Sequence, residues 1–448
     1  MAFGVDGLVS GLNTGAMVDA MVAVYSLPQQ ALEQQIVDTE AKKQAIAGVM
    51  NRLDKVDDAI EDIEDEDDFK VYKADYEETD AFKVTTENGA IPGNYTIQVN
   101  SLATTELEIS QGFDDKSSTG VIAEGELVVK YGDTESTITI DSSNSSLSAL
   151  ASALDDIDGL SAYVLNTGAD TEPYKLVVQG EDTGADNTIA FNTAGLTGSG
   201  TVPSFTEQRS ADDAEIEING ITVVDSDNEF GSSVPGLDIE IYQTTSSAEN
   251  VTVSLDKDQI QDNVQSIITA YNDVRKFVSS KSVHSTELGI SGPLIGETAV
   301  TRVLRNIQSV VSEEYSTGDT LNSLSLMGIK TQSDGTISID SDEFGDALDN
   351  YLDDVVAMFT DEDGGFSTAM REKIDVYTDS VDGTLESYKD SLESRVRDLE
   401  KSVDDYDYRI KRYEERLRSQ FNSMESVLGG MQGTSNYMSA YLGSSQKS

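Results

Sequence analysis

One long amphipathic pattern decides the fold: residues 381–431 read VDGTLESYKDSLESRVRDLEKSVDDYDYRIKRYEERLRSQFNSMESVLGGM. Apolar residues recur at steps of three and four, which keeps them on one stripe of an α-helix. They are Val381, Leu385, Tyr388, Leu392, Val396, Leu399, Val403, Tyr406, Ile410, Tyr413, Leu417, Phe421, Met424, Leu428 and Met431. Two places take two consecutive steps of four, which favours a nearly straight rod. An unbroken helix from about Glu372 to Met431 would be roughly 90 Å long, so it needs a partner along its length.

The partner pattern lies near the other end of the chain. Residues 41–69 carry a second helical stripe at Ile46, Val49, Leu53, Val56, Ile60 and Ile63. We expect the two stripes to form a coiled-coil stalk, with Leu399, Val403, Tyr406 and Ile410 against Val49, Leu53, Val56 and Ile60. Before this stripe, Asn13-Thr14 is suited to cap a short helix carrying Val18, Met21, Val22 and Tyr25. Pro28 then fits the first turn of a second helix.

Between the two stripes the period changes to two. Alternating apolar residues from Phe69 to Leu255, separated by Gly, Asn, Asp and Ser clusters, predict a β-rich head. Asn219-Gly220 predicts a tight hairpin, and Ser146 to Ile157 a short helix. Gly112–Gly120 and Gly195–Pro203 read as linkers that divide the head into two subdomains. The predicted fold class is α+β, with a long helical stalk from both termini and an inserted β-rich head.

The expected boundaries follow from these patterns. After Asp258 the helical period returns, runs again from Ala299 to Val311, and is interrupted by a hairpin at Ile329–Ile339 that turns at Asp334-Gly335. The expected segments are 1–40 (N-terminal docking), 41–69 (stalk helix), 70–112 with 204–256 (inner head), 113–203 (outer head), 257–370 (helical stalk domain), 371–431 (long coiled-coil helix) and 432–448 (C-terminal docking).

The chain is strongly acidic. Its 448 residues include 83 Asp or Glu and 30 Lys or Arg, a net charge of −53. Residues 71–260 alone hold 35 acidic and 7 basic side chains, a difference of −28. Such a surface repels phosphate, so nucleic acid and anionic membranes are poor partners. There is no cysteine, which excludes disulfides and thiol chemistry. The longest apolar run, Ala20–Tyr25, predicts neither a signal peptide nor a membrane span.

Residues that carry chemistry are scarce. His284 is the only histidine, so no Ser/His/Asp triad and no zinc site is expected. The acidic runs at Asp340/Asp342 and Asp361–Asp363 lack EF-hand spacing, and no phosphate-binding loop occurs. We therefore expect no enzyme activity, no cofactor and no metal. The candidate functional residues are instead apolar positions near the chain ends, which predict docking to another chain: Leu8, Leu12, Val18, Met21, Leu428, Met431, Tyr437, Tyr441 and Leu442.

Several short patterns, in order, resemble one family. GLVSGLNT at 7–14, PGNY at 92–95, VNSLA at 99–103, VPGL at 234–237, AYN at 270–272, GPL at 292–294, MGI at 327–329 and DGT at 334–336 are similar to those of the flagellar hook-associated protein 2 family, the filament-capping proteins. The tail is similar too, with YEERL at 413–417, QF at 420–421, ME at 424–425, and Tyr437-Met438 and Tyr441-Leu442.

The resemblance implies a non-enzymatic, homo-oligomeric ring at the distal tip of the flagellar filament, with a homopentamer as the family default. It implies flagellin as a partner that folds and inserts beneath the ring, together with hook-filament junction proteins and an export chaperone. It also implies secretion through the flagellar type III export apparatus.

Two alternatives stay open at this point. A surface adhesin that binds host mucin would need a recognition face on 113–203, and it is compatible with the cap. A secreted acidic hydrolase would need a pocket with two carboxylates of separated pKa, of which the sequence gives no sign.

Overall fold

The computed structural model describes residues 11, 13–77, 79–231, 233–285, 289–317 and 320–445. The chain separates into two compact units: a helical unit, Met1–Glu66 with Gln261–Ser448, and a β-rich unit, Asp67–Ile260. The predicted α+β class, with long terminal helices and an inserted β-rich region, is confirmed.

The helices are α1 (Thr14–Tyr25), α2 (Leu27–Glu61), α3 (Glu66–Phe69), α4 (Leu147–Asp155), α5 (Lys257–Lys281), α6 (Thr298–Val311), the 3₁₀ helix η1 (Leu324–Met327), α7 (Ser341–Asn350), α8 (Leu352–Thr360), α9 (Phe366–Thr378) and α10 (Thr384–Ser445). The strands of the helical unit are β15 (His284–Ser285), β16 (Ile290–Ser291), β17 (Ile329–Thr331) and β18 (Ile337–Ile339). β17 and β18 form the predicted hairpin at Asp334-Gly335.

The strands of the β-rich unit are β1 (Tyr72–Tyr76), β2 (Phe82–Thr86), β3 (Gly93–Ser101), β4 (Leu107–Ser110), β5 (Gly125–Tyr131), β6 (Thr134–Ile140), β7 (Leu160–Asn166), β8 (Tyr174–Gly180), β9 (Ile189–Leu196), β10 (Phe205–Arg209), β11 (Ala214–Ile218), β12 (Ile221–Asp225), β13 (Leu237–Ile241) and β14 (Glu249–Leu255).

The short first helix begins where the sequence predicts. The side-chain oxygen of Asn13 accepts the N–H of Ala16 at 3.0 Å, which satisfies one of the free donors at the start of α1. α2 begins at once after Ser26, and Pro28 occupies its first turn, where a missing N–H costs no hydrogen bond. α1 and α2 therefore follow each other with a single residue between them.

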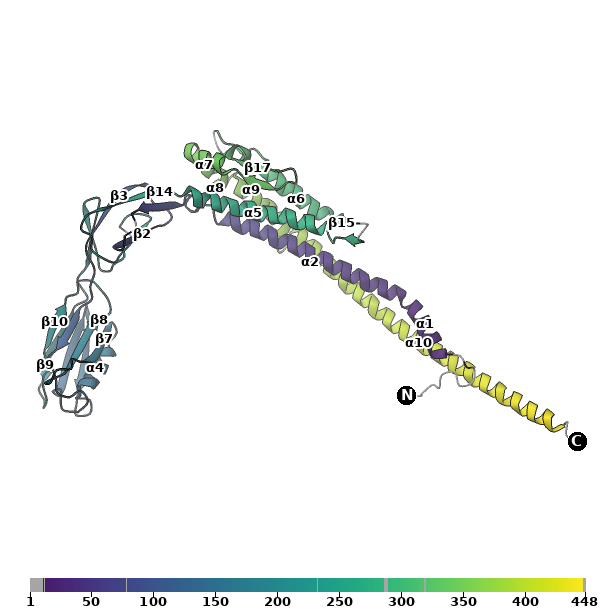
Figure 1. Ribbon diagram of the computed structural model, residues 1–448, viewed down its shortest axis with the longest axis horizontal. Coiled ribbons are helices and arrows are strands. Elements are labelled where there is room, and N and C mark those ends of the chain that lie inside the picture. Colours follow the sequence, from purple (N-terminus) through teal and green to yellow (C-terminus); the bar gives the residue numbers. More distant parts are fainter. Residues whose placement is uncertain are drawn as a thin grey trace. The chain divides into compact units, whose positions relative to one another are not determined.

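α2 packs antiparallel to α10 (Figure 1). Gln29 Nε2 donates to Asp407 Oδ1 at 2.6 Å, and the rings of Tyr25 and Tyr413 stack with centroids 4.4 Å apart. The early residues of α2 thus meet the middle of α10. α1 and the C-terminal half of α10 are therefore brought to the same end of the helical unit.

The expected unbroken helix from Glu372 to Met431 is wrong. α9 ends at Thr378, α10 starts at Thr384, and α10 continues past Met431 to Ser445. The break is a turn in which Asp379 accepts the backbone N–H groups of Val381 at 2.8 Å and Asp382 at 2.9 Å. At Gly383 an added Cβ would lie 2.3 Å from the Asp379 carbonyl oxygen, so only glycine fits. Val381 is 87% exposed and does not belong to the buried stripe.

The expected pairing of Leu399–Ile410 with Val49–Ile60 is also wrong. Because Asp407 meets Gln29, residues 399–410 lie beside the first turns of α2. Val49 is 20 residues further along, or about 30 Å at the rise of an α-helix. The buried stripe at Val49 and Ile60 instead belongs to the part of α2 that packs against α9, to which Arg371 connects it.

The first core of the β-rich unit combines a five-stranded sheet, in the order β1-β14-β3-β11-β12, with the pair β13-β2. All of these pairs are antiparallel, and their inward residues include Ile97, Val99, Ile216 and Ile239. The predicted hairpin joins β11 to β12: Asn219 and Gly220 have φ of 53° and 74°, which a type I′ turn requires.

The second core combines the sheet β10-β4-β8-β7 with the sheet β6-β5-β9 and α4. Ser146 caps α4 by accepting the N–H of Ala149, as expected for the predicted short helix. β4 and β10 were assigned by sequence to the inner head, but both pair within this sheet. The boundary between the two cores therefore lies near the Thr104–Asp212 bridge rather than at 113 and 203.

Three carboxylates gather at the edge of this second core. Glu106 is buried, and its Oε2 accepts the N–H of Ile189 at 2.9 Å. Glu108 faces Glu207 across the β4–β10 pair, and its buried Oε2 has no hydrogen-bond partner in the part of the chain that the structure describes. Burial, and then the charges of Glu106 and Glu207, raise the pKa of Glu108 from 4.5 to about 7.

This raised pKa predicts a pH dependence of stability. Between pH 4.5 and about 7 the folded chain holds a proton on Glu108 that the unfolded chain has released, so the free energy of unfolding falls as pH rises through this window. In Glu108→Gln this fall should be smaller, and the variant should be more stable than wild type at pH 8. Urea unfolding at pH 5 and pH 8 measures both.

The matched control is Glu126→Gln, at an exposed position of β5. It should keep the wild-type pH dependence. Equal pH dependence in Glu108→Gln and in wild type would contradict the assignment of a shifted carboxyl to Glu108.

Candidate functional site

The end of the helical unit where α1 packs against α10 carries an apolar groove. We call α1 together with residues 413–440 of α10 the tip. Met17, Ala20, Met21 and Val24 follow one face of α1 at helical spacing, and with Tyr413 of α10 they line a groove of about 460 Å³. Its walls carry no ionised side chain.

An aromatic stack and an ion pair are among the contacts that hold α1 on α10. The stack of Tyr25 on Tyr413 is a close aromatic pair, worth about 0.5–1.5 kcal/mol beyond its buried area. About one and a half turns beyond it, Asp19 and Arg418 approach to 3.5 Å, and Arg418 also binds Glu414 within α10. The ion pair is exposed and adds little. The position of α1 therefore depends mainly on apolar and aromatic contacts.

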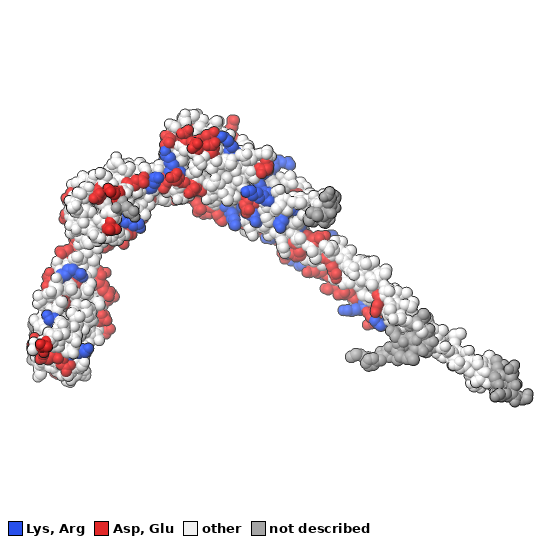
Figure 2. Space-filling view, viewed as in Figure 1, with Lys and Arg blue, Asp and Glu red and all other residues white. Residues whose placement is uncertain are grey.

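Beyond α1, the face of α10 is apolar and exposed. Residues 420–440 contain one charged side chain, Glu425. In Figure 2 this stretch is almost free of colour, whereas acidic side chains are spread over the visible face of the β-rich unit. Large apolar side chains stand free along it: Met424, Val427, Leu428, Met431, Tyr437 and Met438 are between 36% and 72% exposed. A free apolar face of this kind is typical of a surface that binds another chain.

The structure brings together several of the predicted docking residues and separates others. Met21, Leu428, Met431 and Tyr437 are exposed at the tip, as docking requires. Val18 is only 1% exposed on α1, which packs against α10 and α2, so it is not available to a partner. Leu8 and Leu12 lie outside the described residues. Tyr441 and Leu442 lie in α10, but their side chains are outside the description.

The predicted stalk residues are buried to different degrees. Val49, Leu53, Val56, Ile60 and Leu399 are buried. Val403, Tyr406 and Ile410 are half-buried beside the thinner, two-helix part of the unit. In the register that Gln29 and Asp407 define, Val49 to Ile60 do not face Leu399 to Ile410, and packing of Leu399, Val403, Tyr406 and Ile410 against the first turns of α2 is what remains of the predicted coiled coil.

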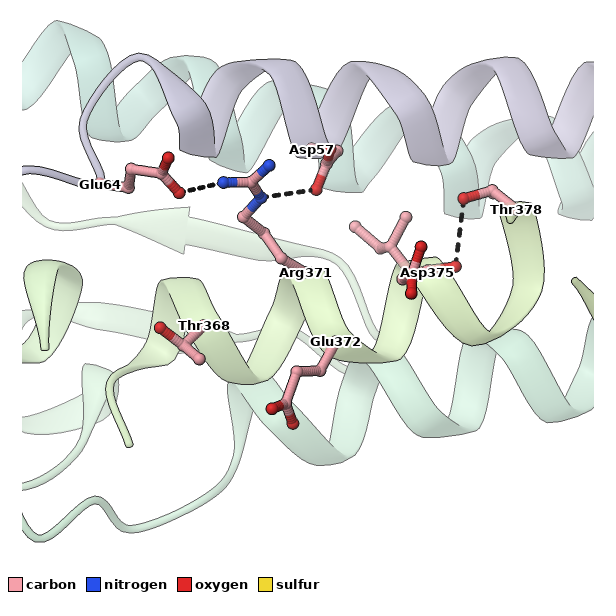
Figure 3. Close-up of a pocket in the computed structure, with 8 residues that line it drawn as sticks. Asp57, Glu64, Thr368, Arg371, Glu372, Asp375 and Thr378 are labelled. Atoms are coloured by element: carbon pink, nitrogen blue, oxygen red, sulfur yellow. Dashed lines mark hydrogen bonds and ion pairs between the residues drawn. The ribbon is translucent and has the colours of Figure 1, made fainter. Parts of the chain in front are cut away.

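A charged clamp joins α2 to α9. Arg371 projects from α9 between Asp57 of α2 and Glu64, which follows α2 (Figure 3). Arg371 Nε lies 3.0 Å from Asp57 Oδ1, and its Nη1 contacts Glu64 Oε2. Hydrogen bonds to Glu64 and then Asp57 raise the pKa of Arg371. The hollow beside the clamp, about 360 Å³, is also lined by Glu372 and Asp375, so it suits no anion.

A second clamp joins α2, α6 and α10 through one carboxylate. Glu297 is the residue before α6 and is mostly buried. Lys42 of α2 lies 2.5 Å from its Oε1, and the Tyr388 hydroxyl of α10 donates to its Oε2 at 2.6 Å. Burial, and then the hydrogen bond to Glu297, raise the pKa of Tyr388 to about 12. The tyrosine is thus held as a neutral donor.

Sequence reasoning missed these clamps and part of the groove. Arg371 and Glu297 stand 314 and 255 residues from their α2 partners Asp57 and Lys42, so no local pattern connects them. Met17 and Val24 could have been predicted as groove residues, because with Met21 they follow helical spacing on α1. Among the described residues, no group of three or more His, Asp or Glu is placed to hold a metal ion. In the same part of the chain, no helix is long and apolar enough to cross a membrane.

Comparison with known families and sequences gives a consistent result. Residues 10–106 match the family model for the flagellar hook-associated protein 2 N-terminus, and residues 211–433 the model for its C-terminus. The A-type flagellar hook-associated protein 2 of Pseudomonas aeruginosa is 24% identical, over 98% of this chain and 97% of its own. The flagellar hook-associated protein 2 of Aeromonas caviae is 27% identical, over 82% of this chain and 83% of its own.

A solved structure shares the fold. The D1-D2-D3 domains of the flagellar cap protein FliD from Escherichia coli are 23% identical and superpose with a TM-score of 0.65. The match covers 78% of this chain and 99% of that one. The segments without a family match, between 107 and 210, include most of the second β core.

The stack at the tip predicts a local effect on α1. Tyr413→Ala should remove about 0.5–1.5 kcal/mol of pairing energy and also apolar contact area, so α1 should open more often. Hydrogen exchange at the amides of residues 17–25 should accelerate, while α5 and α6 keep wild-type protection.

Tyr408→Ala is the matched control, because Tyr408 is on the same helix but 62% exposed. It should leave exchange in α1 unchanged. If both variants leave α1 equally protected, the Tyr25–Tyr413 stack does not hold α1 in place.

The clamp at Arg371 predicts a modest loss of stability. Arg371→Gln leaves Asp57 and Glu64 without their shared cation and should cost about 1 kcal/mol, because the group is one-third exposed and partly screened. The loss should shrink in 1 M salt. Arg397→Gln, which breaks only contacts within α10, to Glu393 and Ser394, should cost about 0.3–0.5 kcal/mol. Equal costs for the two variants in urea unfolding would contradict a clamp between helices.

Proposed function

The chain belongs to the flagellar hook-associated protein 2 family, and on this basis we propose that it caps the distal end of a flagellar filament. In this proposal several copies form a ring, with a pentamer as the family default. Flagellin folds and inserts beneath the ring. The chain reaches this place through the flagellar type III export apparatus, assisted by an export chaperone, and also meets the hook-filament junction proteins.

The observation that carries the proposal is the tip. Two segments almost 400 residues apart, Tyr25 and Tyr413, stack at one end of the helical unit. Beside them Met17, Ala20, Met21 and Val24 line an apolar groove, and residues 420–440 of α10 carry a single charged side chain, although the whole chain has a net charge of −53. A chain that must insert into a filament end needs such a face, since burying unpaired carboxylates there would be costly.

The β-rich unit supports a structural role under the same proposal. It consists of two sheet cores. Its strongly negative charge repels anionic partners such as nucleic acids. The family consists of structural cap proteins rather than enzymes. We propose the same for this chain: its function is structural, and it needs no cofactor. The adhesin alternative is not favoured, because the matching families and relatives are all hook-associated proteins.

The docking role of the tip can be tested with a double substitution. Met21→Asp with Met431→Asp places two charges on the exposed apolar face, which would have to be desolvated on docking at a cost of several kcal/mol. Filament growth in a strain that carries this variant should fail, with unpolymerised flagellin in the medium. Because both positions are exposed, the free energy of unfolding should change by no more than about 0.5 kcal/mol each.

Val376→Asp is the matched control, since Val376 is 57% exposed on α9, away from the tip. It should support normal filaments. Normal filament growth in the Met21/Met431 variant, with the protein present at wild-type levels, would sink the docking role of the tip.

Assembly of the ring should depend on salt. Each copy carries a difference of −28 between 71 and 260, and the screening length falls from about 30 Å at 0.01 M to about 8 Å at 0.15 M salt. Light scattering should therefore detect larger assemblies as salt rises through this range. Assemblies that dissociate as salt rises would show instead that attraction between opposite charges holds the ring together.

A further inference from the structure

The methionines of this chain are divided sharply by exposure. Five lie in the tip and are exposed: Met17 (41%), Met21 (41%), Met424 (37%), Met431 (65%) and Met438 (57%). Every other methionine that the structure describes is buried: Met50, Met327, Met358 and Met370 are at most 8% exposed. Half of the ten methionines in the sequence therefore stand on the face proposed to dock.

Their placement is regular. Met424, Met431 and Met438 recur every seven residues and so share one face of α10, about 10 Å apart. Met17 and Met21 are one turn apart on α1 and line the groove with Tyr413. Flexible thioether side chains of this kind suit a surface that must fit changing neighbours. The same sulfur atoms are chemically the softest groups in the chain, because the sequence has no cysteine to react before them.

We propose that these five methionines form an oxidation site, at which conversion to methionine sulfoxide by a hydroperoxide switches off docking of the tip. The inference rests on the proposed function for its consequence, but not for its chemistry. In each reaction a lone pair of the thioether sulfur attacks one peroxide oxygen, the S–O bond forms and the O–O bond breaks. The second oxygen leaves with the proton of the attacked oxygen, as water from hydrogen peroxide or as an alcohol from an organic hydroperoxide. Sulfur loses two electrons, and the peroxide gains them.

Selectivity follows from exposure. A peroxide must reach the sulfur, and the four buried methionines are shielded by the cores of the helical unit. In the free chain the five tip methionines are open to solvent. A docked tip would cover them, so reaction is expected before docking rather than after it.

The consequence follows from polarity. A sulfoxide carries a strong hydrogen-bond acceptor where the thioether was apolar, and burial of that acceptor without a donor is costly. The groove offers no compensating donor among its lining side chains except the hydroxyl of Tyr413. Several sulfoxides on one face should therefore weaken docking strongly while leaving the buried cores intact.

The site is tested first on the free full-length chain. Hydrogen peroxide is added, samples are digested, and the gain of one oxygen is followed for each methionine by mass spectrometry. The five tip methionines should react at least about tenfold faster than Met50, Met327, Met358 and Met370, which serve as internal controls. Equal rates for the two sets would overturn the proposal.

The switch is tested by comparing wild type with a variant in which all five are leucine, M17L/M21L/M424L/M431L/M438L, a change of nearly conserved volume. Filament capping by purified protein should be lost after peroxide treatment of wild type. It should return after methionine sulfoxide reductase treatment. The leucine variant is compared only with its own untreated sample, and peroxide should leave that level of capping unchanged. Capping by oxidised wild type at the untreated level would overturn the switch. If untreated wild type does not cap, the proposed function fails, whereas the rate comparison still decides the oxidation site.

Discussion

The antiparallel packing of α2 against α10 is the contact on which the rest of the structure depends. Because Gln29 meets Asp407, the start of α2 is fixed beside the middle third of α10, which runs from Thr384 to Ser445. α1 precedes α2 with one residue between them. It therefore packs on the adjacent part of α10, where Tyr25 stacks on Tyr413. The tip is therefore a consequence of helix register. A shift of α2 by two turns would separate these rings and open the groove.

The opposite end of the same helices is held differently. There α2 is covered by α9 as well as by the start of α10, its apolar residues are fully buried, and charged clamps at Arg371 and Glu297 connect the helices laterally. The two-helix part toward the tip lacks this cover and keeps its residues half-exposed. Stability thus declines along the unit while apolar exposure rises, which is the arrangement that a docking end requires. The acidic charge is concentrated in the β-rich unit, away in sequence from the apolar tip.

Local features such as helix caps and tight turns could be predicted from the sequence. The register in which α2 packs against α10 could not. Asn13, Ser146 and Asn219-Gly220 act within three residues of themselves, so cap and turn chemistry placed them correctly. The stripes on α2 and α10 were also found, but each is continuous, and sliding one along the other by a few turns still buries apolar residues. The turn at Asp379 was not predicted, because Val381 happens to lie four residues before Leu385 and so fits the helical spacing of the apolar stripe of α10. The exposed apolar residues of the tip were predicted from their apolar character and their place near the chain ends. Val18 was predicted to be exposed in the same way but is buried, since its burial depends on how α1 packs against α10.

The most direct test of this account is the register of α2 on α10 in solution. Because the chain has no cysteine, single pairs can be introduced into an otherwise unreactive background. A short bismaleimide should cross-link Gln29→Cys with Asp407→Cys rapidly within one molecule. It should leave Leu53→Cys with Leu399→Cys uncoupled, although both stripes contain those positions. Efficient cross-linking of the second pair and none of the first would contradict the register, and with it the origin of the tip.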